Sequence, residues 1–299
     1  MLLLLLPLLG LDIHDLIYYV GVFTIAAKIL PLLPSLKKKL LGAPEELNVK
    51  NYEKDVVYLF QLPGSPTAPS MCAYAVKVDS FCRLHKIKCE KRNSMMARGK
   101  NGLTPFIELN GVEIYDSQLI IEHLTAHFKL QAYPDDKSAA IGHAVDRMID
   151  KHTAMLNMQA KAGKLKDVVT VSASGKVPAI LLPILAFVGS RFMKSKLESK
   201  IKASIGPYTE AEYRAMLRKD LVQIQTILDG KQFLVSEKPS AVDCTALAHL
   251  GVALFGMPSV RTTFDELIDS EELAALKEYL QRLKDTLFGD QFFDPESRA

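Results

Sequence analysis

The sequence predicts an α/β half followed by an all-helical half, both carried behind an apolar N-terminal segment. Three observations predict this order. Between residues 56 and 130, strand-like and helix-like patterns alternate and include a two-residue hairpin signal. From about residue 139 onward, the apolar residues follow helical spacing and no strand pattern is found. Residues 1–41 are dominated by leucine and carry few charges before the last lysines.

The overall composition bounds the classes of function. A chain of 299 residues is long enough for two ordinary domains, each with its own core. Hydrophobic residues make up 48% and charged residues 24%, which is typical of a soluble globular protein. The formal net charge of +3 is too small to indicate a nucleic-acid partner, and no run of Lys and Arg is interleaved with aromatic residues. We therefore expect no nucleic-acid binding.

The four cysteines, Cys72, Cys82, Cys89 and Cys244, have no CxxC spacing. They match neither a disulfide framework nor a zinc site. A reducing, intracellular environment is the simpler interpretation, and pairing in an oxidising lumen is the alternative.

Residues 1–41 are predicted to be an uncleaved membrane anchor. The run Leu16–Leu36 holds only one charge, Lys28, and a helical span needs about 20 apolar residues. A cleaved signal peptide normally begins with basic residues, but no Lys or Arg precedes Lys28 in this sequence. Lysines 37–39 follow the span, and the positive-inside rule then keeps the domain behind them cytosolic. The alternative is an apolar hairpin that only dips into the bilayer. Residues 42–55 are polar and aperiodic, and we expect a linker there.

Residues 56–130 contain the α/β half. The β-branched and aromatic run 56–62 predicts a strand, ended by Pro63-Gly64. Asn110-Gly111 predicts a tight hairpin, because both turn residues need positive φ. The remaining elements are a helix over 70–85, a strand over 87–92, the hairpin strands 106–109 and 112–115, and a helix over 118–129. This is the order of a thioredoxin-like domain.

Residues 139–293 are predicted to form the helical half, with clear helices over 139–156 and 209–228. Residues 177–189 are apolar but too short to span a bilayer, and basic residues follow them. We expect a helix buried in this half or docked on the other half, with a second membrane contact as the alternative. Ser240 and Asp243 predict a variant capping box at a helix start.

Several motifs together resemble one family. These are the loop PGSPTAPSMC, the helix KVDSFCRLHKI, the hairpin approach GLTPFIELNG, the helix start DSQLIIEHL and the late segment QFLVSEKPSAVDCTALAHL. The stretch 56–130 looks like the N-terminal half of glutathione transferases. Residues 56–293 resemble the failed axon connections family, which is related to the metaxins and includes nematode cadmium-inducible lysosomal proteins.

The resemblance implies a glutathione site at two places. Thr104-Pro105 matches the position where the family has a cis proline and where the preceding residue offers its backbone to the cysteinyl part of glutathione. Asp116-Ser117 matches the pair that holds the γ-glutamyl group at a helix start, where unpaired N–H groups suit a carboxylate. The structural alternatives are a trans proline that starts the strand and an Asp116 that simply caps the helix.

Cys72 is the candidate nucleophile. It begins the first helix in Cys72-Ala73-Tyr74-Ala75, which resembles the Cys-Pro-aromatic-Ala start of omega-class transferases, with Ala73 in place of the proline. A helix N-terminus lowers the pKa of a thiol, and the thiolate is the reactive form. We therefore expect either attack on a glutathione mixed disulfide or, as the alternative, a small buried hydrophobe.

No metal site is expected. His123 and His127 have the spacing of zinc ligands, but no third ligand completes a known set. The anchor and the second apolar segment favour a membrane-associated, weakly active or non-catalytic protein, with a protein partner or a second copy as its partner. The resemblance implies a role in stress or cadmium response or in axonal development, at a lysosomal, other endomembrane or mitochondrial outer membrane. The alternative is a glutathione-dependent transferase or thiol reductase that uses Cys72.

Overall fold

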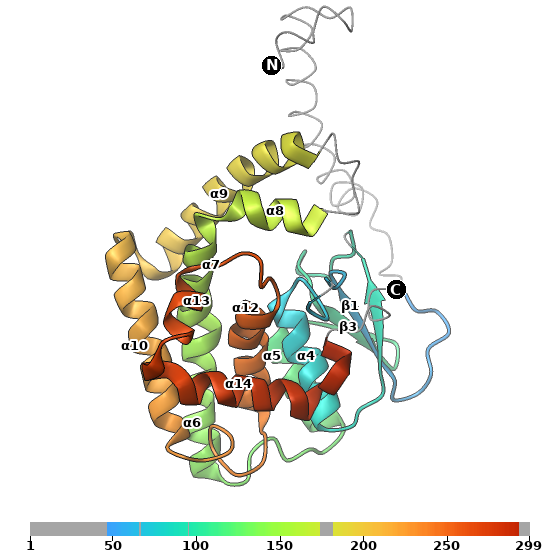
Figure 1. Ribbon diagram of the computed structural model, residues 1–299. Helices are drawn as coiled ribbons and strands as arrows, with labels where there is room; N and C mark the ends of the chain where they lie inside the picture. The colour runs from blue at the N-terminus through green and yellow to red at the C-terminus, as the bar shows by residue number, and fades with distance from the viewer. Residues whose placement is uncertain (1–46, 66, 95, 174–181, 293–299) are drawn as a thin grey trace, which may run out of the picture. The chain divides into compact units, whose positions relative to one another are not determined.

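A four-stranded mixed sheet forms the centre of the first half. A computed structural model describes residues 47–65, 67–94, 96–173 and 182–292 of the chain, and contacts gather the chain from Asn48 onward into one compact unit (Figure 1). The strand order is β2-β1-β3-β4, where β1 pairs with β2 in parallel and with β3 antiparallel. The strands are β1 (Val57–Gln61), β2 (Cys89–Asn93), β3 (Phe106–Leu109) and β4 (Val112–Tyr115). This is the predicted thioredoxin-like order.

The hairpin between β3 and β4 has the predicted bounds. Asn110 and Gly111 both have positive φ, 49° and 81°, which a two-residue turn of this hand requires. Glycine meets that requirement without a side-chain penalty, and asparagine tolerates it better than most residues.

Alternate residues of the central strands serve two separate cores. Val57, Leu59 and Ile107 face the helices α4 (Ala73–Leu84) and α5 (Ser117–His127) and join the main core. Tyr58, Phe60 and Phe106 form a smaller cluster on the opposite face, where the Phe60 and Phe106 rings stack with centroids 4.5 Å apart. The period of two in these strands therefore places one face of the sheet against helices.

The smaller core is closed by part of the stretch expected as a linker. Asn48 and Val49 each donate a backbone N–H to the buried Glu108 carboxylate at 2.8 Å. Asp55 accepts hydrogen bonds from Asn110 and pairs with His127 at 2.8 Å. Residues 48–55 are thus held against the sheet, whereas residues 42–46 and the predicted membrane segment lie outside the described residues.

The second half is helical, as predicted. In Figure 1 its helices α6, α7 and α10 lie to the left of the sheet, with α4 and α5 between. Its elements are α6 (Asp136–Arg147), η2 (Met148–Thr153), α7 (Ala154–Ala162), α8 (Leu165–Ala173), α9 (Leu182–Ile205), α10 (Glu210–Leu228), α11 (Ala241–Ala246), η3 (Leu247–Gly251), α12 (Val252–Phe255), α13 (Thr263–Ile268), η4 (Glu271–Leu273), α14 (Ala274–Leu287) and η5 (Gly289–Phe292).

Two of these helical stretches contain a wider, π-helical turn. In η2 the N–H of Ala154 bonds to the carbonyl of Ile149, and in η3 the N–H of Val252 bonds to the carbonyl of Leu247. Both bonds span five residues, so each segment holds one residue more per turn than the α-helices that flank it.

The capping box at the start of α11 is present. The Asp243 carboxylate accepts the Ser240 backbone N–H at 2.7 Å and the Leu234 N–H at 3.0 Å, and the Tyr279 hydroxyl donates to it at 2.7 Å. The box predicted from sequence therefore also fastens α11 to α14.

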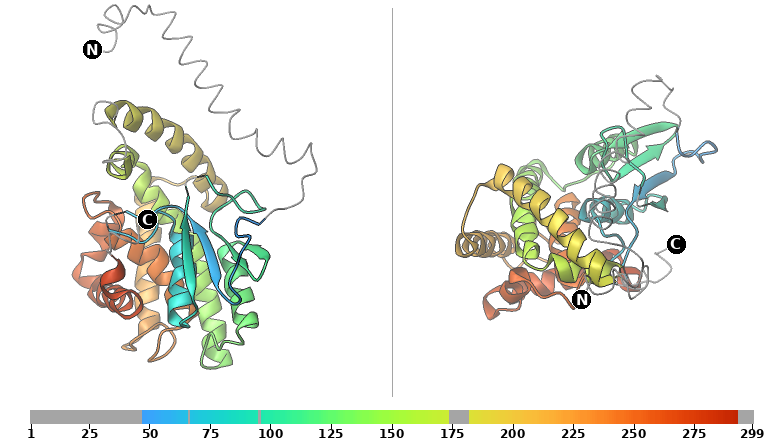
Figure 2. Two further views of the ribbon diagram at one scale, coloured as in Figure 1. Left: turned by 90° about the vertical axis from the view of Figure 1, so that its right-hand side faces the viewer. Right: turned by 90° about the horizontal axis from the view of Figure 1, so that it is seen from above.

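Helices α8 and α9 form a layer over one end of the helical half (Figure 2). The prediction of a buried helix over 177–189 is wrong for its described part, because Ile184, Phe187 and Val188 are 48%, 58% and 54% exposed. Ala186 of the same helix is buried, so the contacts of α9 with α7 and α8 cover only part of its apolar surface. Residues 177–181 lie outside the described residues. Within the described part of the chain, no helix is both long and apolar enough to cross a bilayer.

Candidate functional site

Cys72 is the N-cap residue of α4, with extended backbone angles of φ −107° and ψ 109°. Its backbone N–H donates to the Ser70 hydroxyl at 3.1 Å, and the buried Ser70 donates in turn to the Leu62 carbonyl at 2.8 Å. These bonds hold the end of the loop that precedes α4 and place the Cys72 thiol at the helix N-terminus.

The thiol of Cys72 is not activated. Burial raises its pKa above the ordinary value, although the backbone N–H groups of Ala75 and Tyr74 act to lower it. Its Sγ atom lies 3.8 Å from the Thr104 carbonyl oxygen, to which the protonated thiol donates. The expectation of a lowered pKa is therefore wrong, because the loss of water around Cys72 outweighs the helix N-terminus.

Thr104, which precedes Pro105, lies against Cys72. The peptide bond between Thr104 and Pro105 is cis, as the resemblance implies, and Pro105 is buried. The Thr104 hydroxyl donates to the Ala97 carbonyl at 2.8 Å. The backbone carbonyl of Thr104 therefore faces the thiol of Cys72.

Asp116 is the N-cap of α5 and has a positive φ of 67°. Its carboxylate accepts the N–H groups of Gln118 at 2.9 Å and Leu119 at 3.4 Å, so the capping interpretation holds. Ser117 is different: its side chain is 5% exposed, and its hydroxyl makes no hydrogen bond with any residue the structure describes. A hydroxyl without a partner at a helix N-terminus is suited to a ligand.

The predicted residues gather around the first turns of α4. Tyr74 follows Cys72 by two residues, and its pKa is raised to about 12 by burial and by the nearby charges of Asp150 and Asp116. Asp116 thus lies within electrostatic reach of the phenol. The Tyr74 ring meets the His249 ring edge-on, with centroids 5.0 Å apart.

A cleft of about 390 Å³ opens beside Cys72 and Tyr74. Its other walls belong to the helical half, from α7, α8, α9 and α12. Thr104, Pro105, Asp116 and Ser117 do not line it. The apolar side chains that contribute most of its surface include Leu62, Met158, Leu165, Val168, Leu197 and Val252.

Two polar side chains from α7 face this cleft, and sequence reasoning missed both. Asn157 is 5% exposed, and neither its amide nitrogen nor its amide oxygen has a hydrogen-bond partner among the described residues. Burial lowers the pKa of Lys161, against the opposing charge of Asp265. The available signal was spacing, since Ala154, Asn157 and Lys161 recur along one helix face.

A second group of polar residues is buried where α4 and α5 meet the helical half. Lys77 is 1% exposed, and its Nζ atom lies 2.8 Å from Asp146 and 3.9 Å from Asp150. Asp146 also accepts hydrogen bonds from Thr245 and Arg147. We call Lys77, Asp146, Asp150 and His249 the buried charge cluster; His249 pairs with Asp150 at 3.2 Å.

The carboxylates of this cluster are ionised. Burial acts against ionisation of Asp146 and Asp150, but hydrogen bonds and nearby cations outweigh it and lower the pKa of both. For Asp146 the Lys77 ammonium is the main such group, and for Asp150 it is the hydrogen bond with His249. Burial lowers the pKa of His249 despite the carboxylate beside it.

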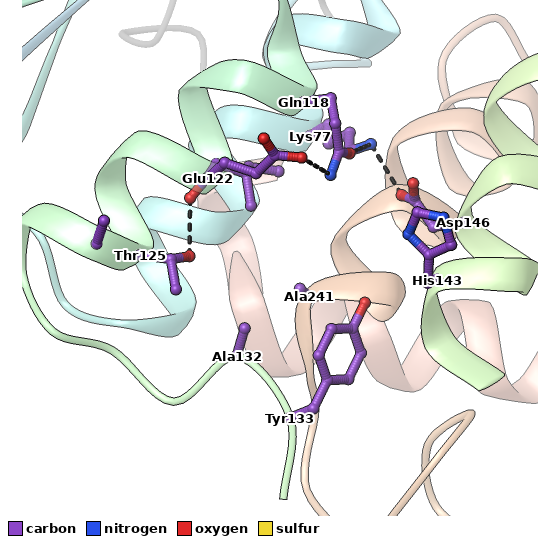
Figure 3. A pocket seen from close by; sticks show the side chains of 11 residues that line it. Lys77, Gln118, Glu122, Thr125, Ala132, Tyr133, His143, Asp146 and Ala241 are labelled. Carbon is purple, nitrogen blue, oxygen red and sulfur yellow. Dashed lines mark hydrogen bonds and ion pairs between the residues drawn. The ribbon is translucent and has the colours of Figure 1, made fainter. Parts of the chain in front are cut away.

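The buried charge cluster borders a pocket of about 310 Å³ between α5 and α6 (Figure 3). Lys77 and Asp146 bond to each other at its upper edge, and Tyr133 lies below them. Gln118 bonds to both Lys77 and Glu122, at 3.2 and 3.1 Å. Because these groups satisfy one another, this pocket presents few polar atoms that need a ligand.

The described residues contain no group of three or more His, Cys, Asp and Glu side chains that could hold a metal ion. The His123 and His127 rings stack with centroids 6.0 Å apart, and the Nε2 atom of His127 lies 2.8 Å from the Asp55 carboxylate.

Comparisons with known proteins bear on this geometry. Residues 73–168 match the family model of the glutathione S-transferase N-terminal domain. The chain is 28% identical over 253 residues to Failed axon connections of Drosophila melanogaster, covering 80% of this chain and 60% of that protein. This is a glutathione-transferase-like protein. It spans less than two thirds of its Drosophila relative, which therefore contains more than the part compared.

Solved structures agree on the fold. The β-etherase LigF of Sphingobium sp. strain SYK-6 has a TM-score of 0.53 at 15% identity, covering 76% of this chain and 94% of that one. A glutathione S-transferase of Ceriporiopsis subvermispora, solved in complex with glutathione, has a TM-score of 0.52 at 14% identity, covering 77% and 97%. At these identities the likeness shows the fold of this glutathione-transferase-like protein and not its substrate.

Proposed function

We propose that this chain is a membrane-associated protein that binds glutathione and has little or no catalytic activity. The observation that carries the proposal is the Ser117 hydroxyl, which belongs to a residue only 5% exposed at the start of α5 and has no hydrogen-bond partner among the described residues. A γ-glutamyl carboxylate would accept from this hydroxyl. The Thr104 backbone lies near enough to Cys72 to receive the cysteinyl part of the same ligand.

We propose low activity because the Cys72 thiol and the Tyr74 hydroxyl both have raised pKa values. Burial raises the pKa of Cys72, and burial raises the pKa of Tyr74 to about 12. Both groups are protonated at neutral pH, so neither supplies the thiolate or phenolate that would activate a reaction. Binding without turnover is therefore the better reading of this geometry.

The test is a calorimetric titration of reduced glutathione into the full chain in detergent. We expect binding at millimolar glutathione or below, and a roughly 10–100-fold weakening in Ser117→Ala, the worth of one hydrogen bond to a charged group. Ser80→Ala is the matched control, because Ser80 is also buried with a hydroxyl lacking a partner among the described residues, but lies away from the site. Absence of binding at millimolar glutathione contradicts the proposal.

The alternative function is a glutathione-dependent transferase or thiol reductase. The Cys72 thiolate would attack the glutathione sulfur of a mixed disulfide and release the substrate thiol, and a second glutathione would release glutathione disulfide and restore Cys72. Disulfide-reductase activity that Cys72→Ser abolishes would establish this alternative. Equal and low rates in the two proteins support the non-catalytic proposal.

Membrane association is the second part of the proposal. It is supported by the apolar residues 1–41, and by the exposed Phe187 and Val188 of α9, which are followed by basic residues. We expect the full chain to stay with membranes through alkaline carbonate extraction, and its release would contradict an anchor. The implied setting is a lysosomal, other endomembrane or mitochondrial outer membrane, with the domain in the cytosol and a role in cadmium or stress response or in axonal development.

A further inference from the structure

Two thiols lie against each other where α4 ends and β2 begins. Cys82 lies in the last turns of α4 and is 1% exposed, whereas Cys89 is the first residue of β2 and is half-buried. Cys82 belongs to the main core, and Cys89 packs against that core. The Cys82 thiol is hydrogen-bonded to the Cys89 sulfur, and this bond and burial raise the pKa of Cys82. One member of the pair is therefore held inside the fold, and the other reaches the surface.

The turn after α4 brings these two residues together. The N–H of Ile87 donates to the Cys82 carbonyl at 2.8 Å, and the N–H of Lys86 donates to the Arg83 carbonyl at 3.1 Å. Lys86 has a left-handed φ of 55°, and the two bonds together form a Schellman motif. This motif reverses the chain at the end of the helix, so that β2 starts beside the helical turn that holds Cys82.

The register of the sheet sets the side on which Cys89 lies. Cys89 is the partner of Val57 in the parallel ladder between β1 and β2, and Val57 belongs to the main core on the face covered by α4. Side chains alternate along a strand, so Lys91 shares this face with Cys89. The Lys91 ammonium does contact Asp79 of α4 at 2.8 Å. The end of α4 and β2 are thus held together at two successive positions of the strand.

The other two cysteines differ from this pair. Cys72 begins α4 at its opposite end, and its thiol donates to a backbone carbonyl. Cys244 is near enough for its charge to act on Cys82, but it is fully buried and its own thiol donates to a carbonyl of its helix start at 3.8 Å. A reagent in solution therefore reaches Cys82 by way of the half-buried Cys89. Two thiols in contact are also the arrangement from which a disulfide forms with little movement of the backbone.

We propose that Cys82 and Cys89 form a dithiol site that glutathione disulfide oxidises to an intramolecular disulfide. The Cys89 thiolate attacks one sulfur of glutathione disulfide, which forms a mixed disulfide on Cys89 and releases one glutathione thiolate. Cys82 then gives up its proton and attacks the Cys89 sulfur, which releases the second glutathione thiolate. Two protein thiols are oxidised, one glutathione disulfide is reduced, and the two released thiolates take up the two protons.

The product links the end of α4 to β2 and leaves no glutathione on the protein. It depends on the ratio of glutathione disulfide to glutathione around the protein, since the reverse exchange reduces it. This inference goes beyond the binding of reduced glutathione at Ser117 and Thr104, and it does not depend on that site.

The test treats the full chain in detergent with glutathione disulfide, blocks the remaining thiols with N-ethylmaleimide in urea, and digests the chain with trypsin. Arg83, Lys86 and Lys88 lie between the two cysteines, so trypsin places Cys82 and Cys89 on separate peptides. We expect mass spectrometry to find these two peptides joined, and to find them separate after treatment with dithiothreitol. Two free thiols, or a link from Cys82 to a cysteine other than Cys89, would overturn the proposal.

Two serine variants test the order of the steps. Cys82→Ser lacks the second nucleophile, so glutathione should remain on Cys89 at about 10-fold or more above the wild-type amount. Cys89→Ser lacks the accessible thiol, so Cys82 should take up no glutathione. Equal amounts of glutathione on Cys89 in the wild type and in Cys82→Ser would mean simple surface modification and would overturn the proposal. Cys82→Ala replaces Cys82→Ser if circular dichroism shows that the serine variant does not fold.

Cys72→Ser is the matched control, because Cys72 is also half-buried but lies at the other end of α4. It should form the Cys82–Cys89 disulfide as fast as the wild type. Loss of the disulfide in this variant would mean that Cys72 reacts first, and it would overturn the direct attack by Cys89. Formation of the disulfide only in urea that unfolds the chain would overturn the proposal as well. A disulfide in a chain that does not bind reduced glutathione would remove the proposed glutathione site and support this inference.

Discussion

Two polar regions in this molecule each contain a lysine withdrawn from the surface, and they differ in how their polar groups are compensated. In the buried charge cluster, Lys77 lies 2.8 Å from Asp146, and each carboxylate has several donors. In the cleft, Asn157 and Lys161 have no such partners among the described residues. The cluster joins α4 to the helical half, whereas the cleft opens between α4 and that half.

This difference in compensation indicates which region stabilises the fold and which region is suited to bind a ligand. A buried ion that is paired and hydrogen-bonded has its desolvation compensated within the protein, so it contributes to the fold. A buried polar group without such compensation lowers stability unless a ligand supplies the partner. We therefore expect substitutions in the two regions to change stability in opposite directions.

The largest effect should come from Lys77→Met. Removing the ammonium leaves the buried Asp146 and Asp150 without the fully buried cation that they share, with only the partly exposed Arg147 in contact with both, and breaking a buried pair costs about 3–5 kcal/mol. Urea unfolding measures the loss. Lys88→Met is the matched control, since Lys88 pairs with Glu53 on the exposed surface and should change stability by less than about 1 kcal/mol. A loss below about 1 kcal/mol in Lys77→Met would contradict the paired cluster.

The second largest effect is expected at Asp243, a buried carboxylate outside the cluster that also accepts several hydrogen bonds. Asp243→Ala removes the acceptor for Ser240, Leu234 and Tyr279, and we expect a loss of about 2 kcal/mol or more in the free energy of unfolding. Asp243→Asn keeps the shape and one acceptor oxygen, so it should lose less. Equal losses in the two variants would show that the charge, rather than the number of accepted bonds, matters here.

Acid should weaken the cluster in a defined pH window. The folded-state pKa of Asp150 lies below its ordinary value of 3.8, so its ionised form contributes stability above about pH 4 that is lost as the pH falls. Asp150→Asn should reduce the slope of stability against pH in that window by up to about 1.4 kcal/mol per pH unit. Burial raises the pKa of Asp243, so this residue changes stability with pH in the opposite direction. It is present in both the wild type and Asp150→Asn, so its contribution cancels in the comparison. Parallel urea midpoints of wild type and variant between pH 5 and 3 (a range of about two units) would contradict the assignment.

The smallest effect distinguishes the cleft. Asn157→Leu and Lys161→Met replace uncompensated polar groups with apolar ones, and we expect stability to stay the same or rise by about 1 kcal/mol. The same urea unfolding measures it. A loss approaching that of Lys77→Met would mean that Lys161 is a structural residue like Lys77, and the distinction between the regions would fail.

Local features of the sequence predicted much of the fold. Asn110-Gly111 and the Ser240–Asp243 box depend on neighbours in the chain, so their outcome was readable from spacing. The pKa of Cys72 was not readable, because the burial that raises it comes from segments distant in the sequence. The exposed side of α9 was missed for a related reason, since apolar composition says nothing about which neighbours are present.

The same limit applies to the candidate site. Asp116, Ser117, Thr104 and Cys72 were found through motifs, and Thr104 does lie against Cys72. Asn157 and Lys161 belong to no motif. Their significance arises only once three helices surround them and leave them without partners.

The π-helical turn η2 sets the rotational phase of α7. An α-helix turns about 100° per residue, so one inserted residue rotates everything after it by roughly that angle. Before the insertion, Asp146 points to Lys77; after it, Asn157 and Lys161 point into the cleft. If Met148–Thr153 were instead ordinary α-helix with the same residues, Asp146 would keep its direction, and Asn157 and Lys161 would lie roughly 100° around the helix axis from the cavity. The extra residue in η2 thus lets one continuous helical stretch direct Asp146 toward Lys77 and direct Asn157 and Lys161 toward the cleft.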